Sequence, residues 1–464
     1  MLSAVSKRNL NDMTEGVIWK QVLLFAVPIM LSYLLQQFYN TVDSIVVGQY
    51  VGKFALAAVG STASTINLLI GFFVGLSAGA GVVISQAFGN RDYKSLHDAV
   101  HTAIALAILS GIVLGVIGVI AVPWILNLIN TPEDVFGMAE SYLRITFAGL
   151  IFTTIYNIGS GILMATGDSK RPLYYLAIGS VLNISLNLLF VITFNMGANG
   201  MAYATVIGQA VSAVLVMINL VRTTLPYKVT LKNIKIYWVQ LKTIVRIGIP
   251  AGIQSIVVSL SNVIIQSYIN SFGSTVMAGF TAASKINSFI YMPFSAVALA
   301  ATTFVGQNVG AKKLDRVKKG IRTCVVMGAV AAIAAGWPAA LFARPMVSLL
   351  NTDPEVVACA STIVRILSTF YFIFAIGEVL NGVIKGAGTS IPPMIISLST
   401  MCVFRIIWLA ILVPMTENVN VITICYPVSW ACASVVFIIY ALKGKWLKKH
   451  EEAIGMSEAK TIIN

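Results

Sequence analysis

Residues 36–48 read Gln-Gln-Phe-Tyr-Asn-Thr-Val-Asp-Ser-Ile-Val-Val-Gly and continue a long apolar run that begins near residue 18. The run is longer than the about 20 apolar residues that a transmembrane helix needs, yet it contains two glutamines, an asparagine and Asp43. A carboxylate at the centre of a membrane helix costs about 2.5–3.5 kcal/mol on insertion scales, so it indicates a function. We therefore expect Asp43 to take up a proton or a metal cation.

The composition excludes an ordinary soluble protein. Of the 464 residues, 58% are hydrophobic and 10% are charged, and the mean hydropathy is +0.87; soluble domains carry about 25% charged residues. Long apolar runs recur from end to end, whereas a β-barrel would show short alternating segments. The sequence therefore predicts an all-α polytopic membrane protein. The five cysteines form no CxxC pair, so neither a disulfide framework nor a structural zinc site is expected.

Twelve transmembrane helices can be placed along the chain. They are predicted near residues 18–50, 54–88, 94–122, 134–165, 172–194, 199–221, 241–271, 276–307, 315–343, 355–387, 392–414 and 420–442. The net charge of +14 comes from Lys and Arg in alternate short loops. This pattern predicts that both termini are cytoplasmic, in a multi-pass protein of the inner (cytoplasmic) membrane. Membrane topology therefore explains the positive charge, and no nucleic-acid partner is expected. No cleavage site precedes the first run, so we interpret it as a retained span.

The two halves of the chain resemble each other at an offset of 221–222 residues. Pro28 aligns with Pro250, and Gln86-Ala87-Phe88-Gly89 aligns with Gln307-Asn308-Val309-Gly310. Six spans per half is an even number, so both halves start on the same side of the membrane. This predicts two six-helix lobes related by a pseudo-two-fold axis along the membrane normal. The predicted parts are an N-terminal lobe at 1–222, a cytoplasmic linker with an interfacial helix at 223–240, a C-terminal lobe at 241–446 and a cytoplasmic tail at 447–464.

Polar residues of the first half fall at similar depths. Asp43 lies 15 residues after Pro28, and Asn187 lies 15 residues after Pro172, about 22 Å along a helix in both cases. Asn183 shares a helix face with Asn187, and Thr205 lies just inside the next span. One carboxylate with amide and hydroxyl oxygens suits a hard monovalent cation or a proton relay. The alternative is that the asparagines only join helices by hydrogen bonds.

The second half carries a different embedded carboxylate, Glu378. Lys285, Arg365 and Arg405 are the embedded cations that could neutralise it, and a structural ion pair and a coupling or substrate role both stay open. His97 and His101 are spaced for a metal, but no third ligand is evident beyond Asp98 and Asp92, so a zinc site is not expected. No Walker A motif and no catalytic constellation is present, so neither ATP hydrolysis nor another enzyme activity is expected.

Several motifs together resemble the multidrug and toxic compound extrusion (MATE) family, in its bacterial NorM-like and DinF-like forms. They are Val42-Asp43 with Gly48, Gln86-Ala87-Phe88-Gly89, the segment 161–172 with Gly161, Gly167, Ser169 and Pro172, and Asn183-Ile184-Ser185-Leu186-Asn187. The resemblance covers essentially the whole chain. It implies a cation or proton site, which could hold Na⁺, at Asp43, Asn183, Asn187 and Thr205, with Tyr142 and Asn157 in the same cavity. It also implies a second site at Glu378, for which the matching position on the seventh span is the amide Asn262.

The function implied is export of cationic or amphipathic drugs and toxic compounds in exchange for protons or sodium ions, by alternating access of two lobes. Substrate would bind among Gln36, Tyr39, Lys285 and Phe289. No cofactor beyond the coupling ion is expected, and the expected partners are small molecules and membrane lipid, with the protein a monomer. The alternatives are a flippase for lipid-linked sugars, which would need a larger and more basic cavity, and a membrane-embedded enzyme.

Overall fold

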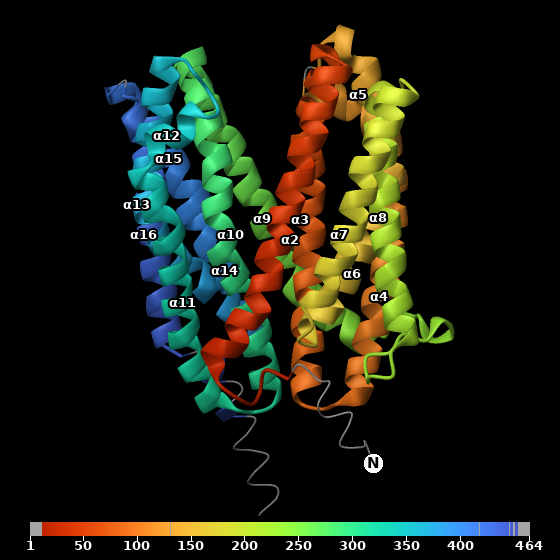
Figure 1. Ribbon diagram of the computed structural model, residues 1–464. Helices are drawn as coiled ribbons and strands as arrows, with labels where there is room; N and C mark the ends of the chain where they lie inside the picture. Colours follow the sequence, from red (N-terminus) through yellow and green to blue (C-terminus); the bar gives the residue numbers. More distant parts are fainter. Residues whose placement is uncertain (1–11, 130, 417, 445, 449–450, 453–464) are drawn as a thin grey trace, which may run out of the picture. The chain divides into compact units, whose positions relative to one another are not determined.

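The computed structural model describes residues 12–129, 131–416, 418–444, 446–448 and 451–452 (Figure 1). The first basic residues and most of the predicted tail lie outside this part of the chain. The helices of the first half are α2 Ile18–Tyr50, α3 Lys53–Gly89, α4 Tyr93–Leu128, α5 Glu133–Ala148, α6 Leu150–Ala165, α7 Lys170–Asn187, the π-helical turn η1 Leu188–Thr193 and α8 Gly197–Arg222. The linker contains the 3₁₀ turn η2 Leu231–Asn233. The second half contains α9 Trp238–Ser271, α10 Ser274–Gly310, α11 Leu314–Leu341, α12 Ala343–Ser348, α13 Pro354–Gly386, α14 Ile391–Leu398, the π-helical turn η3 Ser399–Val403, α15 Phe404–Thr416 and α16 Val419–Leu442.

The predicted all-α polytopic class is confirmed. Within the described residues, eleven helices are long and apolar enough to cross a membrane, and one bent pair would make twelve. That pair is α5 and α6, whose axes differ by 45°, so the uninterrupted span predicted at 134–165 is corrected. The bend falls at Gly149, where an added Cβ would lie 2.7 Å from Cγ1 of Val206 on α8. A glycine here lets α8 approach closely, and it weakens the helix at the same point.

The chain forms two compact units, and the boundaries between them fall inside helices α2 and α9. Unit 1 contains residues 31–248, and unit 2 contains residues 12–30 together with the chain from residue 249 onward. These boundaries lie two or three residues after Pro28 in α2 and one or two before Pro250 in α9. A proline inside a helix removes one backbone hydrogen bond and is a usual place for a helix to bend. The compact units therefore differ from lobes bounded at 222 and 241, because α2 and α9 each pass from one unit to the other.

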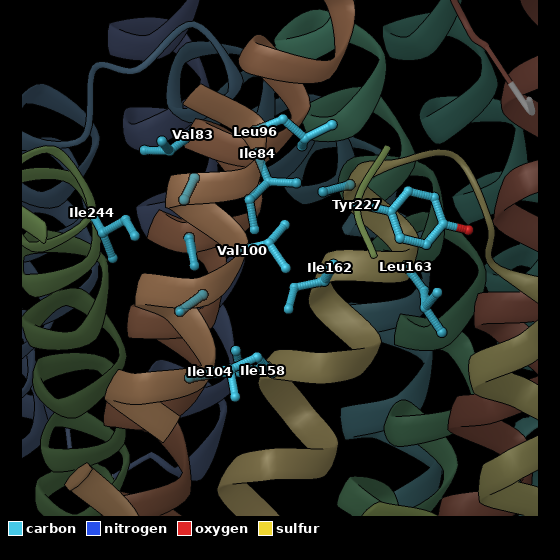
Figure 2. Packing of buried hydrophobic residues seen from close by; sticks show 14 of the residues in the cluster. Val83, Ile84, Leu96, Val100, Ile104, Ile158, Ile162, Leu163, Tyr227 and Ile244 are labelled. Atoms are coloured by element: carbon cyan, nitrogen blue, oxygen red, sulfur yellow. The ribbon is translucent and has the colours of Figure 1, made fainter. Parts of the chain in front are cut away.

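Unit 1 has a hydrophobic core that also holds the linker. Buried side chains of α3, α4 and α6, among them Ile84, Val100 and Ile158, pack together with Tyr227 and Ile244 (Figure 2). Tyr227 belongs to the linker and Ile244 to the first turns of α9. The linker and the start of α9 are thus part of unit 1.

The linker contains no interfacial helix, which corrects the prediction for 223–240. Residues 223–237, all of them described, contain a turn at 225–227 and the 3₁₀ turn η2, and no α-helix. The backbone instead bonds to α4: the Thr230 N–H donates to Nε2 of His101 at 3.0 Å, and the Tyr237 N–H donates to Oγ1 of Thr102 at 3.1 Å. Nδ1 of His101 lies 2.7 Å from the His97 carbonyl oxygen, so Nδ1 carries the hydrogen and Nε2 accepts. His101 therefore fastens the linker, and the described residues contain no group of three or more metal-ligating side chains.

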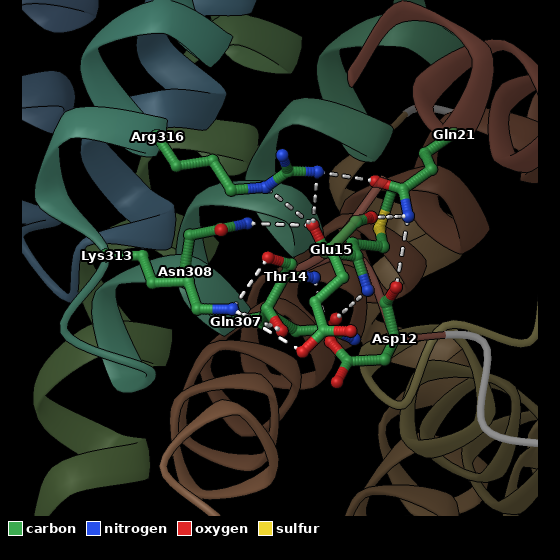
Figure 3. A network of polar contacts seen from close by, with 9 residues as sticks. Asp12, Thr14, Glu15, Gln21, Gln307, Asn308, Lys313 and Arg316 are labelled. Atoms are coloured by element: carbon green, nitrogen blue, oxygen red, sulfur yellow. Dashed lines mark hydrogen bonds and ion pairs between the residues drawn. The ribbon is translucent and has the colours of Figure 1, made fainter. Parts of the chain in front are cut away.

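The segment before α2 is held by unit 2. The Met13 N–H donates to Oε1 of Gln307 at 2.9 Å, and Nδ2 of Asn308 donates to the Met13 carbonyl at 3.1 Å. Nη2 of Arg316 donates to the same carbonyl at 3.3 Å and to Oε1 of Gln21 at 2.8 Å (Figure 3). The Gln307-Asn308 pair of the repeated motif thus anchors the N-terminal part of α2 to unit 2.

Candidate functional site

Asp43 lies inside unit 1, with only 3% of its surface exposed. Nδ2 of Asn187 donates a hydrogen bond to its Oδ1. Asn187 is completely buried and is the last residue of α7, immediately before the π-helical turn η1. Short π-helical turns inside membrane and soluble helices frequently occur at functional sites. The structure therefore brings together two residues that sequence analysis placed at the same depth.

Asn183 and Thr205 form the second pair of this cluster. Nδ2 of Asn183 on α7 lies 3.2 Å from Oγ1 of Thr205 on α8. The two helices approach closely at a pair of glycines: an added Cβ at Gly179 would lie 2.7 Å from the Gly208 carbonyl oxygen, and one at Gly208 would lie 2.8 Å from the Gly179 carbonyl oxygen. Small residues at such crossings let helix backbones meet in a membrane. This contact places Asn183 next to Thr205.

Two buried oxygen atoms of the cluster have no hydrogen-bond donor. A carboxylate can only accept, so Asn187 must turn its Nδ2 toward Asp43, and its Oδ1 is left without a partner. Oδ1 of Asn183 is likewise buried without a partner. An unpaired buried polar atom costs about 1–3 kcal/mol. Carboxylate and amide oxygens are the ligands that hard cations prefer, so the residues present fit a small cation or, at Asp43 alone, a proton.

Tyr142 and Tyr39 are neighbours of the Asp43 carboxylate, and Gln209 is a neighbour of Tyr39. Tyr142 is buried among Val47 and neighbouring side chains, and Asp43 and Tyr39 are its ionisable neighbours. Gln209 lies beside Tyr39, and its Oε1 is also buried without a partner. Sequence analysis missed Gln209. Its spacing of four residues from Thr205 puts it on the same helix face, and this was the signal available.

Asn157 and Gln36 are less closely involved. Nδ2 of Asn157 donates to the Thr153 carbonyl of its own helix at 2.9 Å, and its backbone carbonyl accepts from Oγ of Ser77 at 3.2 Å. The side chain of Asn157 is thus used within α6 and is not joined to Asp43. Gln36 is exposed on α2, next to Tyr39.

The residues predicted for the second half make no hydrogen bond or ion pair with one another within the described part of the chain. Asn262, Lys285 and Phe289 are exposed on α9 and α10, and no hydrogen bond or ion pair among the described residues joins them to Glu378. Glu378 is partly buried on α13, and its ionisable neighbour is Lys385 of the same helix.

The cations proposed to neutralise Glu378 lie elsewhere. Arg365 is exposed, as Lys285 is. Arg405 is buried, but it bonds to Ser429 and packs on Tyr426. Arg405, one of the three cations considered for Glu378, thus has other partners, because position along a helix does not give the direction in which a side chain points around it.

A polytopic all-helical fold with a carboxylate buried among amides in its membrane-spanning part is typical of a membrane transporter. The MatE family model matches the chain twice, at residues 28–189 and 250–411. The chain belongs to the MatE family, and it is a transporter and not an enzyme. The two matches are displaced by 222 residues (250 − 28 = 222), which confirms the internal repeat.

Relatives and solved structures agree with this assignment. The chain is 32% identical to the probable multidrug resistance protein YoeA of Bacillus subtilis, over 82% of this chain and 84% of that protein. It is 26% identical to the probable multidrug resistance protein NorM of Thermotoga maritima, over 93% of each chain. Its fold is similar to a crystal structure of MATE in the bent conformation, with a TM-score of 0.88, 22% identity and coverage of 95% of this chain and 98% of that chain.

Proposed function

We propose that this protein is a secondary active antiporter that exports cationic or amphipathic toxic compounds in exchange for protons or sodium ions. The observation that carries the proposal is the buried carboxylate of Asp43, which accepts a hydrogen bond from Asn187. The amide oxygens of Asn187 and of Asn183, one helical turn away on α7, are buried without a donor. The names of the relatives, which are multidrug resistance proteins, support drugs as the cargo. We place the protein in the bacterial cytoplasmic membrane as a monomer with both termini cytoplasmic.

The coupling ion acts by changing the charge of Asp43. A proton turns the carboxylate into a neutral acid, so the charge-assisted hydrogen bond from Asn187 weakens and α2 is released from α7. A sodium ion would satisfy the carboxylate and the orphaned amide oxygens of Asn183 and Asn187 together. Either ion thereby alters how α2 packs against α7. Because α2 continues into unit 2, this local change provides a route for alternating access.

The energy available depends on the charge of the cargo. One charge moving inward yields about 2.3 kcal/mol per 100 mV, and a tenfold ion gradient yields about 1.4 kcal/mol. If one ion is exchanged for one monovalent cation, no net charge moves and only the ion gradient drives export. If the cargo has no net charge, the exchange moves one charge inward, so the membrane potential also drives export. Each 100 mV then raises the highest cargo concentration ratio that the transporter can maintain by about 50-fold.

Ethidium efflux from proteoliposomes tests the proposal. The purified protein is reconstituted, ethidium is loaded inside, and a pH gradient and a sodium gradient are imposed separately. We expect one inwardly directed gradient to accelerate efflux above that of protein-free liposomes and the other to have no effect. Equal efflux with and without both gradients would rule out antiport.

A further inference from the structure

Unit 2 contains a buried arginine that the proposed ion site does not use. Arg405 lies on α15 with 3% of its surface exposed. Its Nε donates to Oγ of Ser429 at 2.8 Å, and the Ser429 hydroxyl donates onward to the Tyr426 carbonyl at 2.8 Å. The ring of Tyr426 lies against the guanidinium, with 4.5 Å between the ring centroid and Cζ. One nitrogen and one face of the guanidinium are therefore held by α16.

Among the described residues, the positive charge of Arg405 has no carboxylate partner. Its ionisable neighbours are Tyr426, Cys425, Cys402 and Tyr371, and no ion pair of Arg405 occurs within the described part of the chain. A guanidinium does not lose its proton in proteins and has five N–H donors. A charged side chain within a membrane domain without a counter-charge indicates a functional site by default.

The two Nη groups are the free part of this side chain. Neither Nη group makes a hydrogen bond to a described residue. A fully buried nitrogen without a partner would be an unsatisfied polar atom, and neither Nη group is one. Both therefore retain some accessible surface. Four N–H donors in a planar fork match the geometry of a carboxylate. These donors are the part of Arg405 that an anion could reach.

The surroundings hold Arg405 in a fixed position. The π-helical turn η3 precedes it and is attached to α9, because Oγ of Ser261 donates to the Met401 carbonyl at 2.8 Å. Tyr426 contacts Trp430, and Trp430 stacks on Phe374 of α13 with ring centroids 5.0 Å apart. The guanidinium thus lies at the edge of an aromatic cluster. A cation beside aromatic rings is suited to bind an aromatic acid, whose carboxylate would contact the guanidinium and whose rings would contact the aromatic side chains.

We propose that the Nη groups of Arg405 bind a monovalent anion, in the form of the carboxylate of a zwitterionic amphipathic cargo or of an inorganic anion such as chloride. The proposal rests on the proposed function, since it assigns unit 2 a part in cargo recognition. It divides the work between the units: Asp43 in unit 1 binds the cation, and Arg405 in unit 2 binds the anion. A zwitterion has no net charge, so its export could also use the membrane potential.

Tetramethylrhodamine and its methyl ester form a matched pair of probes, because they share one fluorophore and differ in a free carboxylate. Binding of each dye to the purified protein in nanodiscs is measured by fluorescence polarisation, which does not depend on transport. In Arg405→Gln we expect the affinity for the acid relative to the ester to fall about tenfold to a hundredfold, with the ester unchanged. Arg365→Gln removes an exposed arginine and should leave the ratio unchanged.

Two further variants keep the test decisive if Arg405→Gln does not fold. Arg405→Lys keeps the charge but lacks the planar set of N–H donors, and Ser429→Ala removes the acceptor that orients the guanidinium. In both variants the affinity for the acid relative to the ester should lie between the values of the wild type and of Arg405→Gln.

Replacing most of the chloride by sucrose of equal osmolarity distinguishes the two sources, and the Arg405 variants control for the lower ionic strength. A ratio that depends on Arg405 identifies the cargo carboxylate. Weaker binding of both dyes to the wild type alone identifies an inorganic anion. The same acid-to-ester affinity ratio in all variants, with an equal response to the removal of chloride, would overturn the proposal. Failure of ethidium efflux in the wild type would instead refute the proposed function and leave this binding test valid.

Discussion

Asp43→Asn is expected to reduce gradient-driven ethidium efflux to the rate of protein-free liposomes. The asparagine keeps the size of the side chain and can still accept the hydrogen bond from Asn187, but it cannot take up a proton or carry a negative charge. Folding should not suffer, because the substitution removes a charge whose insertion costs about 2.5–3.5 kcal/mol. We therefore expect loss of transport with an unchanged or higher melting temperature, measured on the same preparation.

Two variants control this result. Ser44→Ala changes the adjacent exposed side chain, whose hydroxyl donates to the Asn40 carbonyl of its own helix, and it should transport at the wild-type rate. Asp43→Glu keeps the carboxylate but moves it by about one bond length, so activity should be intermediate. Wild-type efflux in Asp43→Asn would refute the role of Asp43.

Gly208→Ala is expected to damage both the stability and the ion site. The added Cβ would lie 2.8 Å from the Gly179 carbonyl oxygen and 3.1 Å from Cβ of Asn183, so α7 and α8 must move apart. Overpacking of this kind costs about 1–3 kcal/mol. The same movement lengthens the 3.2 Å hydrogen bond between Asn183 and Thr205. We expect a lower melting temperature in detergent and at least tenfold slower efflux.

Gly137→Ala is the matched control, because no atom lies within 4 Å of its added Cβ on α5. An alanine there should favour the helix by up to about 1 kcal/mol and leave efflux unchanged. If both glycine variants behaved alike, the close approach of α7 and α8 would not be what holds the site together.

The part of the site that sequence could predict is the part fixed by position along helices. Counting 15 residues from Pro28 and from Pro172 put Asp43 and Asn187 at one depth, and the structure joins them by a hydrogen bond. The four-residue spacing of Asn183 and Asn187 put both on one face of α7. The internal offset of 221–222 residues predicted the repeat, which the two family matches confirm.

What sequence could not predict depends on contacts around and between helices. The exchange of α2 and α9 between the units follows from packing on both sides of Pro28 and Pro250, which no local pattern encodes. The linker mixes Lys with apolar residues like an amphipathic helix, but His101 and Thr102 bind its backbone in an extended form. The partners of Arg405, which are Ser429 and Tyr426, could not be predicted from its sequence position, because rotation around a helix decides which neighbours a side chain meets.

Release of the coupling ion by cargo tests the central claim most directly. Ethidium is added to the purified wild-type protein and to Asp43→Asn in weakly buffered detergent solution with a pH indicator, and separately to protein loaded with radioactive sodium. The wild type should release close to one ion, proton or sodium, for each ethidium bound, and Asp43→Asn should release none. Equal release from both proteins would show that the exchanged ion binds elsewhere than Asp43.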